Sequence, residues 1–204
     1  IEFSLPATAF KNISYCLENG VPVVSGTTGW HEQMPAMKEW CKQHNGAFFY
    51  ASNFSIGVNI LFAVNRILAS FMQKQKQYDV SIEEIHHTQK LDYPSGTALT
   101  LAEGILENSS IKKSWSAILD NDIKEIGTNG DKDVLQIISK RESSVPGTHF
   151  VKWQSSIDHL ELSHVAHSRE GFAMGALLAA EWVIGKQGIF DMNDLLGFPS
   201  SGLT

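Results

Sequence analysis

The chain has 204 residues, of which 43% are hydrophobic and 19% are charged, as in globular proteins and unlike disordered or fibrous ones. Its formal net charge of -6 argues against nucleic acid as a partner, since nucleic-acid binding needs a clustered basic face. No apolar stretch is long enough to cross a bilayer and no signal peptide precedes the first motif, so we expect a cytoplasmic protein. Cys16 and Cys41 lack the spacing of a metal or redox motif and are expected to be free thiols.

The first 54 residues alternate between strand and helix patterns. The opening stretch up to Pro6 has the character of the end of a buried strand, and apolar residues then recur at helical spacing from 9 to 17. Short buried strands are expected at 21–25 and 47–51, separated by a helix from about 34 to 44. This alternation predicts parallel strands joined by right-handed crossovers, a doubly wound α/β domain.

From about residue 55 the pattern changes to mostly consecutive strands. Helices are expected over 59–75 and 97–107, and strands over 78–86, 115–119, 134–140, 149–153 and 159–167. Such an order predicts an α+β domain built on a mixed or antiparallel sheet. A helix at about 169–185 and the tail after it should pack on the first domain. We therefore assign 1–54 with 169–204 to one domain and 55–168 to the other.

The most informative segment is residues 84–98, with the sequence EIHHTQKLDYPSGTA. It sets two adjacent histidines and Lys90 beside a turn that opens onto a helix. Histidine exchanges a proton near neutral pH, and lysine supplies a positive charge. The Ser-Gly-Thr turn leaves backbone N–H groups unpaired at a helix N-terminus, where an anion is favoured. These residues suit a small acidic substrate that must be bound and protonated.

This segment resembles the active-site motif E-x-H-H-x-x-K-x-D-x-P-S-G-T-A of the dihydrodipicolinate reductase family, also called 4-hydroxy-tetrahydrodipicolinate reductases. Other stretches resemble the same family in the same order, namely Gly26–Gly29, Ala51–Asn59, Ser139–His149 and His164–Ala176. The resemblance covers nearly the whole chain. It implies reduction of 4-hydroxy-tetrahydrodipicolinate to tetrahydrodipicolinate with NADH or NADPH, in lysine and diaminopimelate biosynthesis. It also implies a homotetramer assembled through the substrate domain, with apolar strand faces at 134–138 and 150–153 in the interface.

The resemblance also assigns roles to the site residues. His86 would donate the proton, and Lys90 would hold a substrate carboxylate and assist protonation. The other substrate-binding residues would be His87, Ser95, Gly96 and Thr97. Cofactor contacts would come from two loops, comprising Gly26, Thr27 and Thr28 in one and Ala51, Ser52, Asn53 and Phe54 in the other. No metal is implied.

Several of these residues also have a purely structural interpretation. Asn53 could cap the next helix, Phe54 could be a core residue, and a threonine in a βα turn is often a helix cap. Arg141 and His149 could face the substrate or be paired sheet residues. Arg169 could form a structural ion pair or contact the ligand.

The family's nucleotide-binding half begins with a glycine-rich phosphate loop, and none precedes Gly26. We therefore expect a partial Rossmann-like domain that lacks its first βα units. Two alternatives to the enzyme stay open. One is a chain that binds the dicarboxylate and oligomerises without turnover. The other is a metal-dependent hydrolase, with ligands drawn from His86, His87, Lys90, Asp92, His164 and His167. The choice between NADH and NADPH depends on a residue in the part expected to be missing.

Overall fold

The computed structural model describes residues 1–120 and 131–198. The chain forms two compact units, Ile1–Asn59 with Glu170–Thr204, and Ile60–Arg169. We refer to them as the first and the second unit.

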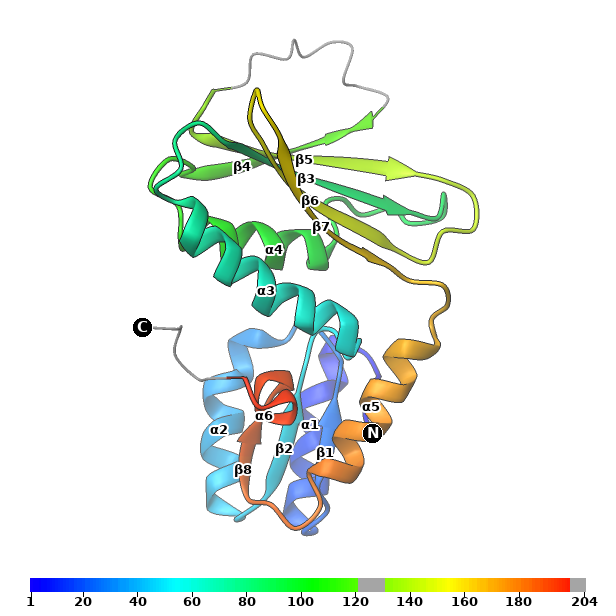
Figure 1. The fold of residues 1–204 in the computed structure, drawn as a ribbon. Coiled ribbons are helices and arrows are strands. Elements are labelled where there is room, and N and C mark those ends of the chain that lie inside the picture. The colour runs from blue at the N-terminus through cyan, green and yellow to red at the C-terminus, as the bar shows by residue number, and fades with distance from the viewer. Residues whose placement is uncertain (121–130, 199–204) are drawn as a thin grey trace. The chain divides into compact units, whose positions relative to one another are not determined.

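The first unit is built on a three-stranded parallel sheet in the order β1-β2-β8 (Figure 1). Its strands are Val23–Ser25, Ala47–Tyr50 and Gly188–Phe190. Its helices are α1 (Pro6–Glu18), the short η1 (His31–Gln33), α2 (Met34–Gln43), α5 (Glu170–Trp182) and α6 (Met192–Leu196).

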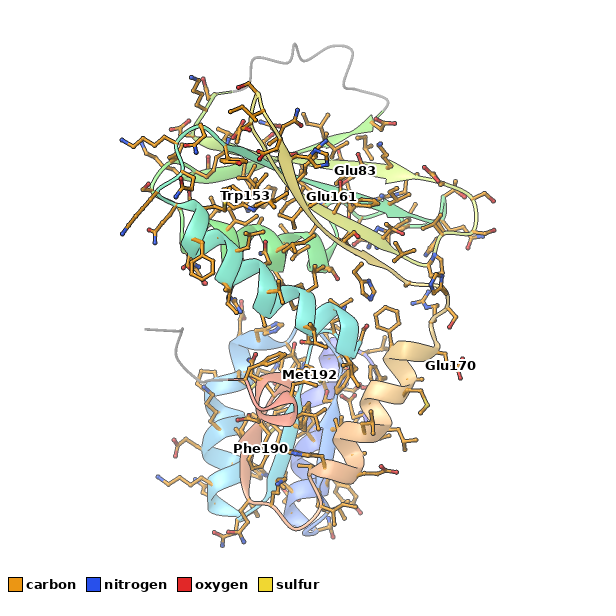
Figure 2. The ribbon with its side chains drawn as sticks, in the orientation of Figure 1. Glu83, Trp153, Glu161, Glu170, Phe190 and Met192 are labelled. Carbon is orange, nitrogen blue, oxygen red and sulfur yellow. The ribbon has the colours of Figure 1, made fainter. Side chains whose placement is uncertain are left out.

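Helices cover both faces of this sheet. One core cluster joins α1 and α2 to the sheet through Ile13, Met37 and Phe48. The other joins α5 and α6 to the opposite face, with Phe190 packing against it and Met192 buried in it (Figure 2). A parallel sheet with helices on both faces confirms the predicted α/β class. Beside β1, a single parallel bridge between Glu2 and Ser25 extends the sheet, which agrees with a strand ending before Pro6.

The second unit is built on a five-stranded sheet in the order β4-β5-β3-β6-β7. The strands are β3 (Asp79–His86), β4 (Ser114–Leu119), β5 (Val134–Arg141), β6 (Thr148–Gln154) and β7 (His159–Val165). β3, β4 and β5 pair in parallel, whereas β6 is antiparallel to both β3 and β7. The predicted mixed sheet is therefore confirmed.

Two helices, α3 (Ile56–Met72) and α4 (Gly96–Leu106), cover one face of this sheet (Figure 1). Beneath them Ile82, Ile137 and Val151 stand in one row across three strands and are fully buried. The residues between them, such as Ile138 and Phe150, point to the other face and are half-buried. No helix in the described part of the chain packs on that face.

Two expectations need correction. The tail contains a third parallel strand, β8, which the sequence did not reveal because three residues beginning with glycine carry no alternation. The segments 134–138 and 150–153 are not wholly available for an interface, since Leu135, Ile137, Val151 and Trp153 are buried on the helix-covered face. Both cysteines are free thiols, as expected. None of the described helices is long and apolar enough to span a membrane.

Candidate active site

The candidate site lies at the carboxyl end of β3. This strand alternates, so that Val80, Ile82, Glu84 and His86 all point to the helix-covered face. Val80 and Ile82 belong to the hydrophobic core, whereas Glu84 and His86 place polar groups on the same buried face. Glu84 has no exposed surface and His86 is 8% exposed. A buried carboxylate and a buried imidazole therefore stand two residues apart on the same side of the strand.

Both oxygens of Glu84 have partners. The Ser139 hydroxyl donates to Oε1 over 2.7 Å, and the backbone N–H of Ser95 donates to Oε2 over 3.0 Å. The guanidinium of Arg141 lies 3.8 Å from Oε1. Because a buried charge is tolerated only when it is paired and hydrogen-bonded, these contacts explain how Glu84 can stand in the interior.

Arg141 also fastens the loop that follows β3. Its guanidinium donates to the backbone carbonyls of Lys90 at 3.0 Å, Lys140 at 2.7 Å and Asp92 at 2.9 Å. The Lys90 ammonium in turn lies 2.5 Å from the Asp92 carboxylate, and this hydrogen bond lowers the pKa of Asp92. Arg141, whose role was open, thus holds the loop that carries Lys90.

The histidine pair of the site is His86 with His149. Their ring centroids are 5.1 Å apart and the ring planes are nearly perpendicular. His149 lies on the neighbouring strand β6, where it pairs with Glu84 of β3. His86 Nδ1 lies 3.4 Å from Glu84 Oε2 but without hydrogen-bond geometry, and His149 Nε2 shares a 3.1 Å hydrogen bond with the Ser95 hydroxyl. Gly147 leaves space beside His86, since a Cβ there would stand 3.2 Å from Nε2.

Burial favours the neutral form of both imidazoles. It lowers the pKa of His149 to about 3, with further lowering by His86, His164 and Lys90. Burial also lowers the pKa of His86, Glu84 opposes that effect, and Lys90, Arg141 and His87 add to it. Of the two rings, only His86 has its pKa raised in part by Glu84, against the lowering by burial.

The N-terminus of α4 completes the site. Ser95 is its N-cap, and its hydroxyl accepts a hydrogen bond from the Ala98 N–H over 3.2 Å. Gly96 is exposed, and a Cβ on it would meet no described heavy atom within 4 Å. Backbone N–H groups in the first turn of a helix have no acceptor within the helix and favour an anion. Gly96 therefore offers an open position for a carboxylate, with Thr97 half-buried beside it.

Only some of the site residues predicted for this unit lie close to one another. His86, Ser95 and Gly96 converge around Glu84, whereas Lys90 belongs to the cluster through its loop. His87 is half-buried beyond the end of β3. Sequence reasoning gave no role to Glu84 or Gly147. The signal for Glu84 was available, because residues two apart on a strand share a face.

The predicted cofactor loops lie together at one edge of the first unit. Gly26–Gly29 follows β1 and Ala51–Phe54 follows β2, and the Ala51 N–H donates to the Ser25 carbonyl over 3.2 Å. Ligands of parallel α/β sheets bind beyond the carboxyl ends of the strands, so the position fits a nicotinamide cofactor.

The side chains in these loops differ in whether they are free to contact a ligand. Thr28 and Ser52 are exposed. The Thr27 hydroxyl is engaged internally, donating to the Glu2 carboxylate over 3.1 Å and accepting from the Ser4 N–H over 2.9 Å. Ala51 and Phe54 are core residues, and the Phe54 ring stacks on Phe49. The Asn53 side chain accepts from the Ser55 N–H over 2.9 Å, just before α3.

One group of potential metal ligands occurs among the described residues. It consists of Glu84, His86 and His149, whose ligand atoms lie within 4.8 Å of one another. This is not the ligand set expected for a hydrolase. The carboxylate already accepts two hydrogen bonds, and the guanidinium of Arg141 3.8 Å away would repel a cation. These contacts disfavour a metal ion at this group.

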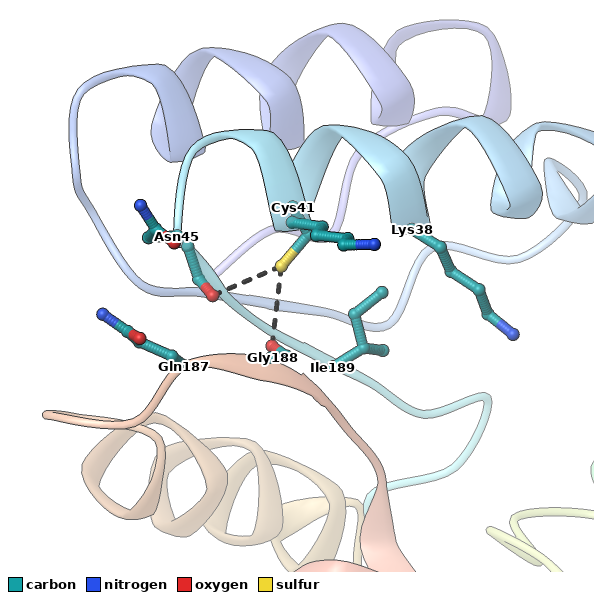
Figure 3. A pocket seen from close by; sticks show the side chains of 8 residues that line it. Lys38, Cys41, Asn45, Gln187, Gly188 and Ile189 are labelled. Carbon is teal, nitrogen blue, oxygen red and sulfur yellow. Dashed lines mark hydrogen bonds between the residues drawn. The ribbon is translucent and has the colours of Figure 1, made fainter.

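A separate pocket of about 520 Å³ lies at the opposite end of the first unit's sheet, beside the starts of β2 and β8 (Figure 3). At its base the Cys41 thiol donates to the carbonyls of Gly46 at 3.3 Å and Gly188 at 3.6 Å. Burial raises the pKa of Cys41, so the thiol stays protonated and structural.

The chain is similar to known proteins over most of its length. Residues 1–54 match the family model of the N-terminus of dihydrodipicolinate reductase, and residues 57–196 match that of its C-terminus. A 4-hydroxy-tetrahydrodipicolinate reductase of Christiangramia forsetii is 53% identical over 196 residues, covering 96% of this chain and 78% of the relative. That of Neisseria meningitidis is 33% identical over 205 residues, covering 97% and 71%.

Among solved structures, a dipicolinate-bound dihydrodipicolinate reductase from Paenisporosarcina sp. TG-14 is similar, with a TM-score of 0.74 and 25% identity. The match covers 94% of this chain and 71% of the other. Two family models that together span most of the chain, and a relative with more than half of its aligned residues identical, lead to one conclusion. The chain belongs to the dihydrodipicolinate reductase family.

Proposed function

We propose that this chain reduces 4-hydroxy-tetrahydrodipicolinate to tetrahydrodipicolinate in lysine and diaminopimelate biosynthesis, with NADH or NADPH as hydride donor and His86 as proton donor. In the balanced reaction, one hydride and one proton are added to the substrate and one water leaves. Family membership and the activity in the relatives' names support the reaction. The observation that carries the assignment of roles is the buried group of Glu84 and His86 beside the open start of α4.

The substrate class follows from the charges around this group. A ring with two carboxylates needs two anion sites, and dipicolinate, found bound to the Paenisporosarcina relative, has that chemistry. We assign one carboxylate to the backbone of Gly96 and the Ser95–Thr97 turn at the start of α4. The other is assigned to Lys90, with His87 beside it. A lysine binds a carboxylate by a charge-assisted hydrogen bond.

His86 is suited to the proton transfer. Hydride addition leaves negative charge on the substrate, so an acid at the right position lowers the barrier. The space beside Gly147 leaves Nε2 of His86 as the nitrogen that can face a ligand. A bound dianion would raise the pKa of His86 and favour its protonated form, offsetting the effect of burial.

The cofactor supplies the hydride when bound, and the protein orients it. In this proposal the two loops of the first unit, Gly26–Thr28 and Ala51–Phe54, contact it. Thr28 and Ser52 would do so through exposed side chains. Ala51 and Phe54 would do so through the backbone, because their side chains are in the core.

We further propose a cytoplasmic homotetramer whose subunits meet through the uncovered face of the five-stranded sheet. Ile138 and Phe150 on that face are partly exposed, and obligate interfaces are large and apolar. A mass measured by light scattering at micromolar concentration tests this. A tetramer is expected, and a monomer would contradict it.

Turnover of the chain as given tests the function. Consumption of NADH and of NADPH should depend on the substrate, dipicolinate should compete with the substrate, and a metal chelator should have no effect. Dipicolinate binding measured by calorimetry without turnover would support the binding-only alternative. Loss of activity with the chelator would point to the metal-dependent one.

A further inference from the structure

We propose that Glu84 is a positioning residue, whose carboxylate fixes the acid His86 and the substrate-binding start of α4 to each other. The inference rests on the function proposed above, because it takes His86 as the proton donor. Glu84 itself is buried and faces no open space, so it acts through its neighbours.

One oxygen of Glu84 connects the two working parts of the site. Oε2 accepts the Ser95 backbone N–H at 3.0 Å, and Ser95 is the residue that begins α4. The same atom lies 3.4 Å from Nδ1 of His86 and 3.9 Å from Nε2 of His149. The start of α4, which is proposed to bind a substrate carboxylate, and the acid His86 are therefore both positioned by the same oxygen atom of Glu84.

The other oxygen fixes the carboxylate to the sheet. Oε1 accepts the Ser139 hydroxyl at 2.7 Å and lies 3.8 Å from Arg141. Ser139 and Arg141 stand on β5, which pairs with β3 in the register Glu84–Ser139 and His86–Arg141. A side chain in contact with α4, β5 and β6 has little conformational freedom. The groups that it orients, His86 and the start of α4, are therefore fixed as well.

The geometry also specifies which nitrogen of His86 works. Nδ1 faces the Glu84 carboxylate, and Nε2 faces the space left by Gly147. A carboxylate near one ring nitrogen favours a proton on that nitrogen and leaves the other for catalysis. Among the charged and titratable groups around His86, Glu84 alone favours the imidazolium, whereas Lys90, Arg141 and His87 oppose it; His149, in ring contact with His86, is itself neutral near neutral pH.

The test is the pH dependence of kcat in Glu84→Gln, which removes the charge and keeps the size. An acid is active when protonated, so activity falls as pH rises through its pKa. In the variant this fall should move to lower pH by roughly one unit or more, the usual scale for loss of a nearby opposite charge. At pH 7.5 kcat should therefore drop about tenfold and recover on acidification.

Three further variants separate charge from structure. Glu84→Asp keeps the charge at a greater distance, so its shift should be smaller and in the same direction. Ser139→Ala removes a hydrogen bond from the carboxylate but keeps the charge, so its pH profile should stay close to that of the wild type. Glu103→Gln changes an exposed glutamate on α4 and should change nothing.

An equal loss of activity at every pH in Glu84→Gln would overturn the inference, because a merely structural role predicts it. So would a shift in Ser139→Ala as large as that in Glu84→Gln. If Glu84→Gln does not fold, an unshifted profile in Glu84→Asp would overturn it as well. Arg141 should not prevent folding, because it keeps three carbonyl acceptors in the variant.

A second measurement does not depend on turnover. The pKa of His86, followed by NMR, should fall in Glu84→Gln relative to the wild type, and an unchanged pKa would contradict the inference. If the wild type failed to reduce the substrate but His86 titrated as expected, the proposed function would be wrong and the link between Glu84 and His86 would remain.

Discussion

The two units treat their predicted ligand-binding residues in opposite ways. In the first unit, the Thr27 hydroxyl is hydrogen-bonded to Glu2 and Ser4, and the Phe54 side chain lies in the core. In the second unit, among the described residues, the Nδ1 atoms of His86 and His149 are buried without a hydrogen-bond partner. A cofactor loop needs mainly the right backbone position, whereas proton transfer needs an imidazole that no hydrogen bond inside the fold engages.

This difference yields a general expectation. Substitutions in the second unit should change turnover, substrate binding or a pH dependence, whereas substitutions in the first unit should change stability at neutral pH or cofactor affinity.

The largest effect is expected for His86→Gln. Loss of a general acid should lower kcat by about 100-fold or more with little change in substrate KM. Steady-state kinetics with His87→Gln as the matched neighbour is the measurement. A normal kcat in His86→Gln together with a collapse in His87→Gln would reverse the roles within the pair.

Lys90→Ala should act on binding and on rate together. A charge-assisted contact to a carboxylate is made in the ground state and in the transition state, so we expect kcat to fall and substrate KM to rise, each by about tenfold. Cofactor KM should stay constant. Asp92→Asn is the control, because it removes the carboxylate 2.5 Å from Lys90 while leaving the cation in place. An unchanged KM in Lys90→Ala would exclude it as the carboxylate site.

The protein should lose stability in acid because of His149. Its pKa falls from 6.5 to about 3 on folding, so the unfolded chain binds a proton that the native chain does not. Stability is therefore complete above about pH 6.5 and decreases as the pH falls towards 3, by about 1.4 kcal/mol per pH unit for one proton.

The lowered pKa values of His86 and His164 act in the same direction. Urea unfolding between pH 7 and 5 measures the slope, and His149→Gln should reduce it by about one proton. Equal slopes in the two proteins would show that His149 titrates normally.

The smallest effects are expected from a pair of neighbouring threonines. Thr27→Val leaves the buried carboxylate of Glu2 without one donor and should cost about 1–2 kcal/mol of stability. Thr28→Val changes an exposed side chain and should leave stability unchanged while raising cofactor KM a few-fold. The opposite result, with Thr27 affecting only cofactor binding, would remove the contrast between the two units.

The parts of the fold that follow local rules could be predicted from the sequence. Helical spacing located α1 and α2, and the clean alternation over 159–167 located β7. The long helix α3 begins at Ile56, earlier than the expected 59, and helix ends are weakly specified by spacing alone.

The contacts of the site could not be predicted in the same way. The pairing of Glu84 with Ser139 and His149 depends on the register between β3, β5 and β6, which joins residues more than fifty positions apart. No local pattern encodes that register. The motif identified which residues matter, and only the sheet showed that Glu84 stands at their centre.

The contacts of Arg141 limit how this loop can change in evolution. The Arg141 guanidinium binds the carbonyls of both Lys90 and Asp92, so the number of residues between His86 and Ser95 is constrained. An insertion or deletion there would pull at least one carbonyl away and shift the lysine relative to the acid. The loop can therefore vary in its side chains but hardly in its length, which makes it a poor place to insert a tag, a linker or a sensor.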